Sequence, residues 1–178
     1  MKVYVPSFLL ILLVLSTAGC IFVNTGNENI TKNYTGYNVS FNYTGDYELG
    51  IDPEGQDGYV TLDLYKGGPV NQSSLSITLK PNIYRSKELA IEKENLGIVM
   101  GMNEVSNDTI IIDNETAYVE VYEGRLPPLP EVMTNQYIVL VKSDMIYIFN
   151  IMVPKEEFDK EKPKFDVVLN SFRVINTG

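Results

Sequence analysis

Residues 137–153, with the sequence YIVLVKSDMIYIFNIMV, decide the fold of this 178-residue chain. Two runs rich in β-branched and aromatic residues are separated there by Ser143-Asp144, which is the pattern of two antiparallel strands joined by a tight turn. The second run, residues 145–153, is apolar at both its odd and its even positions, and alternate residues of a strand point to opposite faces. We therefore expect these strands in the middle of a sheet that is covered on both faces.

Two segments have the pattern of helices that cover this sheet. The first is expected over residues 86–96, with Ser86 as its N-cap and Gly97 placed to end it. The second is expected over residues 163–171, with Pro163 in its first turn. Apolar residues in and directly after this second segment recur at spacings of three and four and form one stripe: Phe165, Val168, Leu169 and Phe172.

Further strands are indicated by alternation with a period of two. Residues 59–65 and 74–79 alternate apolar with polar side chains, which is typical of half-buried antiparallel strands. Residues 108–122 have the pattern of a hairpin that turns at Asp113-Asn114. Together these elements predict an α+β fold class, in which an antiparallel β-sheet is flanked by helices.

The C-terminal part of the chain resembles the PsbP family, the extrinsic proteins of the oxygen-evolving photosystem. The similar motifs are IYI at residues 146–148, PKEEFD at 154–159 and KFDVVLNSFR at 164–173, with weaker matches at FNYT 41–44 and IIDN 111–114. The resemblance implies an α/β/α sandwich over residues 37–174 and a non-catalytic domain of the kind that stabilises a membrane complex. The matching motifs concern core packing, so they imply no site residues.

The composition narrows the classes of function. At 44% hydrophobic and 21% charged residues, the chain has the composition of one globular domain. Its formal net charge of -9 argues against nucleic acid as a partner. The sequence contains no histidine and a single cysteine, so it lacks the commonest metal ligand and the usual general base. No phosphate-binding loop, nucleophile with a histidine, or zinc spacing occurs, and we expect no enzyme activity and no cofactor.

Acidic residues in two regions are explained without a bound ion or a catalytic role, the first as a solvated loop and the second by the helix dipole. Loop 50–58 carries Asp52 and Asp57 but lacks the glycine and glutamate positions of a calcium-binding EF-hand loop. Asp159 and Glu161 precede the second expected helix, where negative charge complements the helix dipole.

The N-terminus predicts export and membrane attachment. Residues 1–19 have a positive residue, an apolar run and then small residues, which is the organisation of a signal peptide. The sequence AGC at residues 18–20 resembles the end of a lipobox, and we predict lipidation of Cys20, with Thr17 standing where leucine is usual. The alternative is an uncleaved anchor, because residues 3–23 carry no charge and are long enough to span a bilayer. Either form places the domain at the outer face of the cytoplasmic membrane.

Residues 20–36 are polar and asparagine-rich and are predicted to be a flexible tether, followed by the PsbP-like domain at residues 37–178. Seven Asn-x-Ser/Thr sequons occur, where chance would give about two, and the excess predicts N-glycosylation. The alternative is that an asparagine-rich composition generates these sequons by itself. The predicted acceptors are Asn29, Asn33, Asn38, Asn42, Asn71, Asn107 and Asn114.

The twelve tyrosines are the other unusual feature of the sequence. Burial between sheet and helices is the commoner arrangement for such residues, whereas an exposed cluster would suit contact with protein or carbohydrate. Five of them fall on expected strands: Tyr59, Tyr65, Tyr118, Tyr122 and Tyr147.

Two hypotheses for function follow. The first is a non-catalytic, membrane-tethered extracytoplasmic domain that acts as an assembly or protein-interaction module of a cell-surface complex, with a protein partner that the sequence does not identify. The alternative is a solute- or metal-binding lipoprotein that serves a transporter. A concave pocket with convergent polar groups favours the binding protein, and a flat apolar and aromatic patch favours the interaction module.

Overall fold

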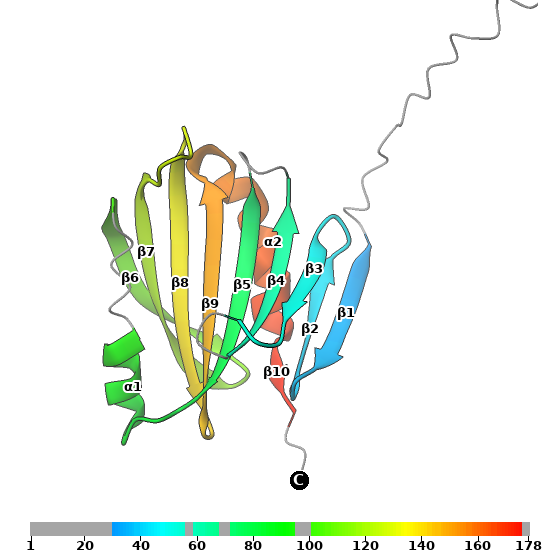
Figure 1. Cartoon of the computed structure of the whole chain (residues 1–178), viewed down its shortest axis with the longest axis vertical. Coiled ribbons are helices and arrows are strands. Elements are labelled where there is room, and N and C mark those ends of the chain that lie inside the picture. The colour runs from blue at the N-terminus through cyan, green and yellow to red at the C-terminus, as the bar shows by residue number, and fades with distance from the viewer. Residues whose placement is uncertain (1–29, 56–58, 68–71, 95–100, 176–178) are drawn as a thin grey trace, which may run out of the picture.

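Seven strands form the main sheet of the computed structural model, which describes residues 30–55, 59–67, 72–94 and 101–175 (Figure 1). Their order is β3-β4-β5-β9-β8-β7-β6, and every neighbouring pair is antiparallel. Strand β9 lies in the middle of this sheet, which confirms the prediction from residues 145–153. The bounds are β3 (Glu48–Asp52), β4 (Val60–Lys66), β5 (Ser73–Pro81), β6 (Met102–Ile112), β7 (Glu115–Arg125), β8 (Val132–Lys142) and β9 (Met145–Pro154).

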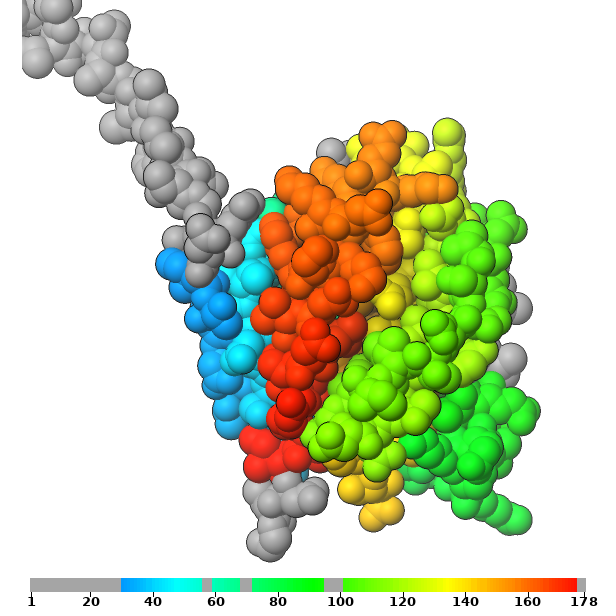
Figure 2. Space-filling model, turned by 180° about the vertical axis from the view of Figure 1, so that it is seen from behind, coloured from blue at the N-terminus to red at the C-terminus, as the bar shows by residue number. Residues whose placement is uncertain are grey.

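The two faces of the main sheet are covered differently. Helix α2 (Phe158–Ser171) and a small sheet pack on one face, which we call the inner face; Figure 2 shows α2 running over it. The small sheet has the order β1-β2-β10, and a short 3-10 helix, η3 (Lys155–Glu157), connects β9 to α2. Helix α1 (Lys87–Glu94) packs on the other face, the outer face, which is toward the viewer in Figure 1. The bounds of the small sheet are β1 (Thr31–Gly36), β2 (Val39–Thr44) and β10 (Arg173–Val174). Both predicted helices are present, and the predicted α+β fold class is confirmed.

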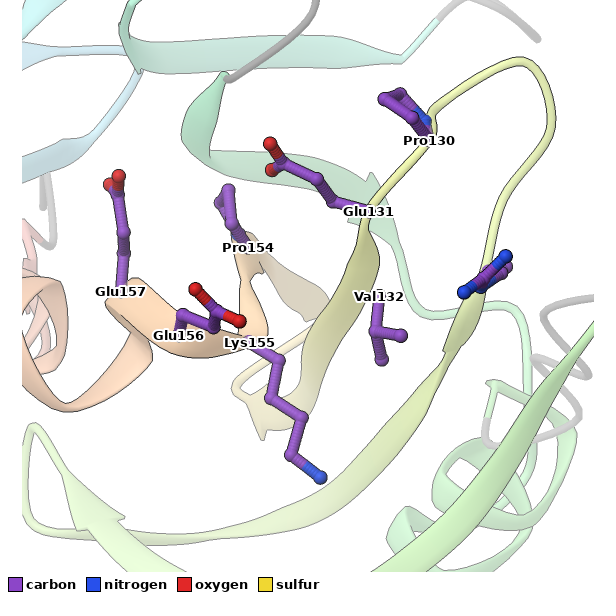
Figure 3. Close-up of a pocket in the computed structure, with 8 residues that line it drawn as sticks. Pro130, Glu131, Val132, Pro154, Lys155, Glu156 and Glu157 are labelled. Atoms are coloured by element: carbon purple, nitrogen blue, oxygen red, sulfur yellow. The ribbon is translucent and has the colours of Figure 1, made fainter.

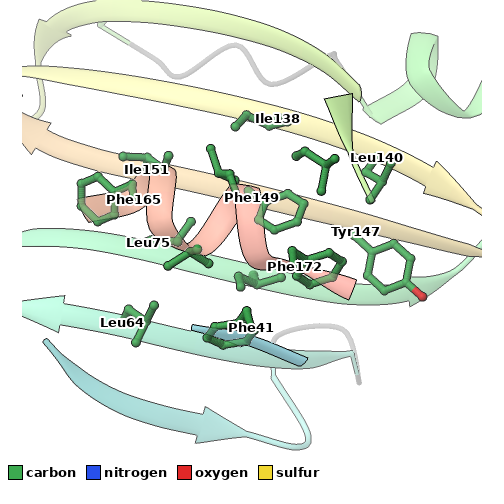
Figure 4. Close-up of a cluster of buried hydrophobic side chains, with 14 of the residues drawn as sticks. Phe41, Leu64, Leu75, Ile138, Leu140, Tyr147, Phe149, Ile151, Phe165 and Phe172 are labelled. Carbon is green, nitrogen blue, oxygen red and sulfur yellow. The ribbon is translucent and has the colours of Figure 1, made fainter. Parts of the chain in front are cut away.

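Strand β9 separates two apolar clusters. Its inner-face side chains pack under α2, where Phe172 contacts the rings of Phe149 and Tyr147 at centroid distances of 4.9 and 5.4 Å (Figure 4). Its outer-face side chains Ile146 and Ile148 pack under α1. The apolar stripe of α2 is buried as expected, because Phe165, Val168, Leu169 and Phe172 all belong to the inner-face cluster.

The turn between β6 and β7 has the geometry that its sequence predicts. Asp113 and Asn114 have φ angles of 50° and 64°, and two successive left-handed residues are what a type I′ hairpin turn requires. The buried Asp113 carboxylate accepts hydrogen bonds from Lys142 Nζ at 2.6 Å and from the backbone N–H of Val174 at 2.9 Å. The turn therefore also holds the C-terminal strand β10 in place.

The predicted start of α2 is wrong by five residues. The helix begins at Phe158, directly after η3, and Pro163 lies inside it rather than in its first turn. Proline lacks the N–H that would bond to the carbonyl four residues earlier, here Asp159. That carbonyl belongs to the first turn of the helix. The missing hydrogen bond therefore lies near the N-terminus of α2, and the following turns are intact.

The predicted flexible tether is wrong for Thr31–Gly36, which forms β1. This strand pairs with β2 along its whole length, and the rings of Tyr34 and Phe41 lie 5.1 Å apart. Strand β3 likewise takes up Gly50 and Asp52, which were expected in a loop. Both are strands at sheet edges, where backbone hydrogen bonds to a single neighbour form the strand. Strand β1 lacks the alternation of apolar residues that marks a strand in sequence, and in β3 only Leu49 and Ile51 show it. The predicted signal peptide and the first part of the tether lie outside the described residues.

Because Phe172 has no exposed surface and contacts aromatic rings from both β2 and β9, we predict that Phe172→Ala lowers the free energy of unfolding by about 3–5 kcal/mol. Urea denaturation followed by circular dichroism measures this change. Ile83→Ala, at a side chain that is 79% exposed, is the control and should change stability by less than about 0.5 kcal/mol. Equal effects of the two substitutions would contradict the packing described above.

Candidate functional site

The outer face of the main sheet is only partly covered. Helix α1 buries Ala90 against Val139 and its neighbours at one end of β8 and β9. Next to it, over β4 and β5, lies an open hollow of about 470 Å³. A second hollow of about 470 Å³ adjoins it and shares Asp52, Asp63 and Ser76 with it. We call this elongated depression the outer groove.

A row of polar side chains crosses the outer face at the groove. Strand register places Asp63 of β4 beside Ser76 of β5, and Ser76 beside Asn150 of β9. Asn150 is in turn beside Tyr137 of β8. Residues paired directly across antiparallel strands lie on the same face with neighbouring side chains, so these four groups form a continuous polar row.

Hydrogen bonds orient two members of this row. Ser76 Oγ donates to Asp63 Oδ1 at 2.5 Å. Asn135 Nδ2 donates to Asn150 Oδ1 at 2.8 Å. Asn135 is 1% exposed, and its own side-chain oxygen has no partner among the described residues. The buried Asn135 therefore fixes the orientation of the Asn150 amide, whose N–H groups make no hydrogen bond among the described residues.

Two tyrosines and an ion pair line the sides of the groove. Tyr59 and Tyr137 come from opposite sides of it, because β5 and β9 separate β4 from β8. Lys80 Nζ lies 5.6 Å from the centroid of the Tyr59 ring and forms an ion pair with Glu94 of α1. Burial, with Glu94 and Glu120 nearby, raises the pKa of Tyr137 to about 12, so its hydroxyl remains protonated at neutral pH.

Beyond Tyr137 the polar row continues to a buried carboxylate. Glu120 of β7 is paired with Tyr137 in register and is 8% exposed. The hydroxyl of Tyr122 donates to Glu120 Oε2 at 2.7 Å. Burial raises the pKa of the Glu120 carboxyl above its ordinary value. The outer face thus carries polar side chains at both exposed and buried positions.

A separate depression of about 390 Å³ lies where the connection from β7 to β8 meets the junction of β9 with η3 (Figure 3). Its charged lining residues have both signs, with Arg125 and Lys155 beside Glu131 and Glu156. Lys155 forms an ion pair with Glu123 of β7. Mixed charges on long side chains are typical of a solvated surface, and this depression offers less chemistry than the outer groove.

The densest group of ionised side chains lies at the start of α2. Lys164 Nζ and Lys66 Nζ are 2.7 and 2.8 Å from Asp46 Oδ2. Glu161 is 1% exposed; its Oε1 lies 3.3 Å from Lys66 Nζ, and its Oε2 accepts a hydrogen bond of 2.8 Å from the hydroxyl of Tyr47. Burial opposes ionisation of both carboxyls, but the bonds from the lysines and from Tyr47 hold the pKa of Asp46 and of Glu161 below their ordinary values. This cluster joins α2 to β4 and to the segment between β2 and β3, so its role is structural.

The predicted modification sites are distributed over the surface rather than brought together. Asn33, Asn38, Asn107 and Asn114 are exposed, and Asn42 is half-buried. Asn33 and Asn42 are paired across β1 and β2, and Asn33 Nδ2 donates to Asn42 Oδ1 at 3.0 Å. Cys20, Asn29 and Asn71 lie outside the described residues. Glycosylation and lipidation remain predictions.

The five tyrosines expected on strands take different positions. Tyr147 is buried in the inner-face cluster, as the commoner arrangement predicts, and Tyr122 is buried on the outer face. Tyr59, Tyr65 and Tyr118 are half-buried. Tyr59 and Tyr65 line the outer groove.

Two absences within the described residues bear on the hypotheses of metal binding and of a membrane-spanning anchor. No group of three or more His, Cys, Asp and Glu residues is arranged to hold a metal ion within residues 30–55, 59–67, 72–94 and 101–175. In the same ranges, no helix has both the length and the apolar character needed to cross a bilayer.

Three proteins of known structure with a similar fold are PsbP, LpqN and Mog1p. Cyanobacterial PsbP (CyanoP) from Synechocystis sp. PCC 6803 has a TM-score of 0.58 and 13% identity, and the match covers 81% of this chain and 92% of that one. LpqN, involved in cell envelope biogenesis of Mycobacterium tuberculosis, has a TM-score of 0.60 and 8% identity, with 83% and 91% covered. The Ran-binding protein Mog1p of Saccharomyces cerevisiae has a TM-score of 0.55 and 11% identity, with 83% and 97% covered. No protein-family model and no curated protein sequence matches the chain. The chain therefore has the α+β fold of PsbP and Mog1, and identities this low establish the fold alone.

Sequence reasoning missed both the outer groove and the ionic cluster. Asp159 and Glu161 were expected just before a helix, where they would complement its dipole. Both lie in the first turn of α2, and Glu161 is also buried, which was not expected. The spacing of three residues between Glu161 and Lys164 is the one local signal of their ion pair. The groove has no local signal, because its residues come from five strands and a helix.

The lowered pKa values of Asp46 and Glu161 predict acid sensitivity. Both carboxyls titrate in the folded protein below the value of about 4 that they have in an unfolded chain, so the stability they contribute is complete above that pH. It is lost as the pH falls through the folded-state values. We expect the free energy of unfolding to decrease from about pH 5 downward, as measured by urea denaturation at a series of pH values.

Glu161→Gln tests the assignment of this effect. Removing one member of a buried ionic group should lower stability at pH 7 by about 3 kcal/mol and should flatten the decrease at acid pH. Glu157→Gln, at an exposed position next to α2, is the matched control and should leave the pH profile unchanged. An unaltered profile for Glu161→Gln would show that other carboxylates control the acid response.

Proposed function

We propose that this chain is a non-catalytic extracytoplasmic domain that is tethered to the outer face of the cytoplasmic membrane and acts as a binding module of a cell-surface assembly. The observation that carries the proposal is the outer groove, a polar and aromatic depression on a part of the outer face that α1 does not cover. This part of the face is therefore open to a partner.

The chemistry of the groove supports binding rather than catalysis. Two serines line the groove, Ser74 and Ser76. Ser76 donates a hydrogen bond to the Asp63 carboxylate, and the sequence has no histidine to act as a base for either serine. The groove carboxylates have fixed partners or lie at the rim: Glu94 is paired with Lys80, and Asp52 accepts from the backbone of Glu54 at 3.1 Å. Polar groups held in place around an open depression suit recognition of a ligand.

Two observations support a tethered module: the proteins of similar fold, and the position of β1 in the molecule. LpqN is described as involved in cell envelope biogenesis, and PsbP is a protein of the same fold. The first described strand, β1, belongs to the small sheet on the side of α2. An anchor that enters through β1 leaves the outer groove open to a partner.

A solute-binding lipoprotein is the second candidate. Convergence of Asp63, Ser76 and Tyr137 on one concave surface favours it, because a flat apolar patch would have indicated protein contact alone. Both candidates use the same groove, and they differ in whether the bound molecule is a solute or part of the assembly.

Photo-crosslinking tests where the partner binds. A photo-reactive residue at Thr61, which lines the outer groove, should give a crosslinked adduct of higher mass in native membranes. The matched control is Lys160, an exposed position on α2, where we expect at most one tenth of the adduct. Adducts at Lys160 with none at Thr61 would place the partner on the inner side and would contradict the proposal.

Cys20→Ser tests the anchor. Two or more acyl or isoprenoid chains, at about 0.8 kcal/mol for each buried methylene, anchor a protein stably. Because the predicted attachment point is the Cys20 thiol, its loss should abolish lipidation and with it this anchor. The precursor should then keep its leader, or the domain should be released from the membrane fraction. Intact-mass measurement and membrane fractionation report both outcomes, and the same masses show whether glycans are attached. Unchanged mass apart from the substitution, with unchanged membrane retention, would favour the uncleaved anchor at residues 3–23.

A further inference from the structure

The floor of the outer groove offers hydrogen-bonding groups of both kinds. Ser76 occupies one carboxylate oxygen of Asp63, and in the described part of the chain Oδ2 accepts no hydrogen bond. Asn150 uses its Oδ1 to accept from Asn135, so its amide N–H groups are the atoms it can offer. Tyr137 adds a protonated hydroxyl at the end of the row. A ligand lying across this row meets an acceptor on β4 and donors on β9 and β8.

The sides of the groove offer ring surfaces. Tyr59 and Tyr137 line the first hollow and Tyr65 lines the second, so aromatic side chains occur along its length. A Cβ added to Gly55 would come within 2.9 Å of the carbonyl oxygen of Tyr59 and 3.0 Å of Thr61 Oγ1. Gly55 therefore lies directly against the start of β4, next to the backbone from which Tyr59 projects.

The charges of the groove argue against ionic ligands. The carboxylates of Asp52, Asp63 and Glu94 would repel an anion. An organic cation would find the Tyr59 ring already covered by Lys80, which also pairs with Glu94, and among the described residues no group of three acidic side chains is arranged to hold a metal ion. An apolar ligand would bury the hydroxyls and carboxylate of the floor without partners, which is unfavourable. The remaining class is a neutral molecule that carries many hydroxyl groups and some apolar C–H surface.

From this geometry we propose that the outer groove binds a neutral saccharide, with Asp63, Asn150 and Tyr137 bonding its hydroxyls and Tyr59 packing on a ring face. This inference rests on the proposed function and names the chemistry of the ligand. Each hollow, at about 470 Å³, falls within the range of about 300–1,000 Å³ that is usual for small-molecule sites. Because the two hollows are continuous, the occupant is an oligosaccharide rather than a single sugar. The groove is open, so both a free oligosaccharide and a segment of a surface glycan can enter it.

The test uses the full-length chain in a detergent without a sugar headgroup. Maltotriose, cellotriose and triacetylchitotriose are titrated separately, and binding is followed by saturation-transfer NMR and calorimetry. We expect at least one of them to bind saturably with a dissociation constant of about 1 mM, corresponding to about -4 kcal/mol. Tyr59→Ala and Asp63→Asn should each weaken that binding at least tenfold.

Matched variants keep the result interpretable. Tyr118→Ala removes a half-buried tyrosine of the same sheet outside the groove, and Asp108→Asn removes an exposed carboxylate of β6. Both should bind the trisaccharide as the unmodified chain does. Circular dichroism checks that each variant is folded. If Tyr59→Ala proves unstable, Asp63→Asn still tests the proposal, because it preserves the size of the side chain.

The source of the saccharide is decided by a second arm, in which polysaccharide from the native cell envelope is sedimented with the protein. If the protein co-sediments with the polysaccharide and Asp63→Asn abolishes this, the ligand is a surface glycan. If a trisaccharide binds but the protein does not co-sediment, the ligand is a free solute. Failure of all three trisaccharides and of the polysaccharide would overturn the saccharide assignment. If the Thr61 crosslink persisted in that case, the groove would still be a contact site and the proposed function would stand.

Discussion

Strand β9 is apolar on both faces, and the need to keep water from both organises the rest of the molecule. On the inner face the requirement is met by α2, whose residue Phe172 lies between the rings of Phe149, Tyr147 and Phe41. The small sheet completes this side, and β10 returns the chain to β2 immediately after Phe172. The position of β10 is thus a consequence of how one central strand is covered.

The outer face is covered only as far as it is apolar. Helix α1 has eight residues and buries Ala90 over Val141, Ile146 and Ile148. The outer-facing residues of β4 and β5 include Thr, Asp and Ser. Helix α1 does not extend over them, and no other described element covers them. Because burying those polar groups without partners would cost free energy, the groove is stable when it is open to water or to a ligand that bonds them.

The two polar groupings of the molecule differ in how they are satisfied. In the cluster at α2, lysines and a tyrosine hydroxyl from the protein itself engage Asp46 and Glu161, and the carboxylates stay ionised in a buried place. In the outer groove, each internal bond engages one oxygen of Asp63 or Asn150, and the other polar atoms of that side chain make no hydrogen bond among the described residues. The first arrangement stabilises the fold, and the second leaves hydrogen-bonding capacity for another molecule.

Local sequence was sufficient for the elements whose geometry depends on neighbours along the chain. The two-sided apolar run predicted that β9 is central, Asp113-Asn114 predicted the hairpin turn, and the spacing of Phe165, Val168 and Leu169 predicted the buried stripe of α2. Only the tertiary structure placed β1 on β2, because an edge strand is formed by backbone bonds that leave no side-chain pattern. Only it brought Asp63, Ser76, Asn150 and Tyr137 into one row, because strand register joins residues that are distant in sequence. The sequence by itself therefore determined the layers of this protein, and the pairing of its strands decided where the groove lies.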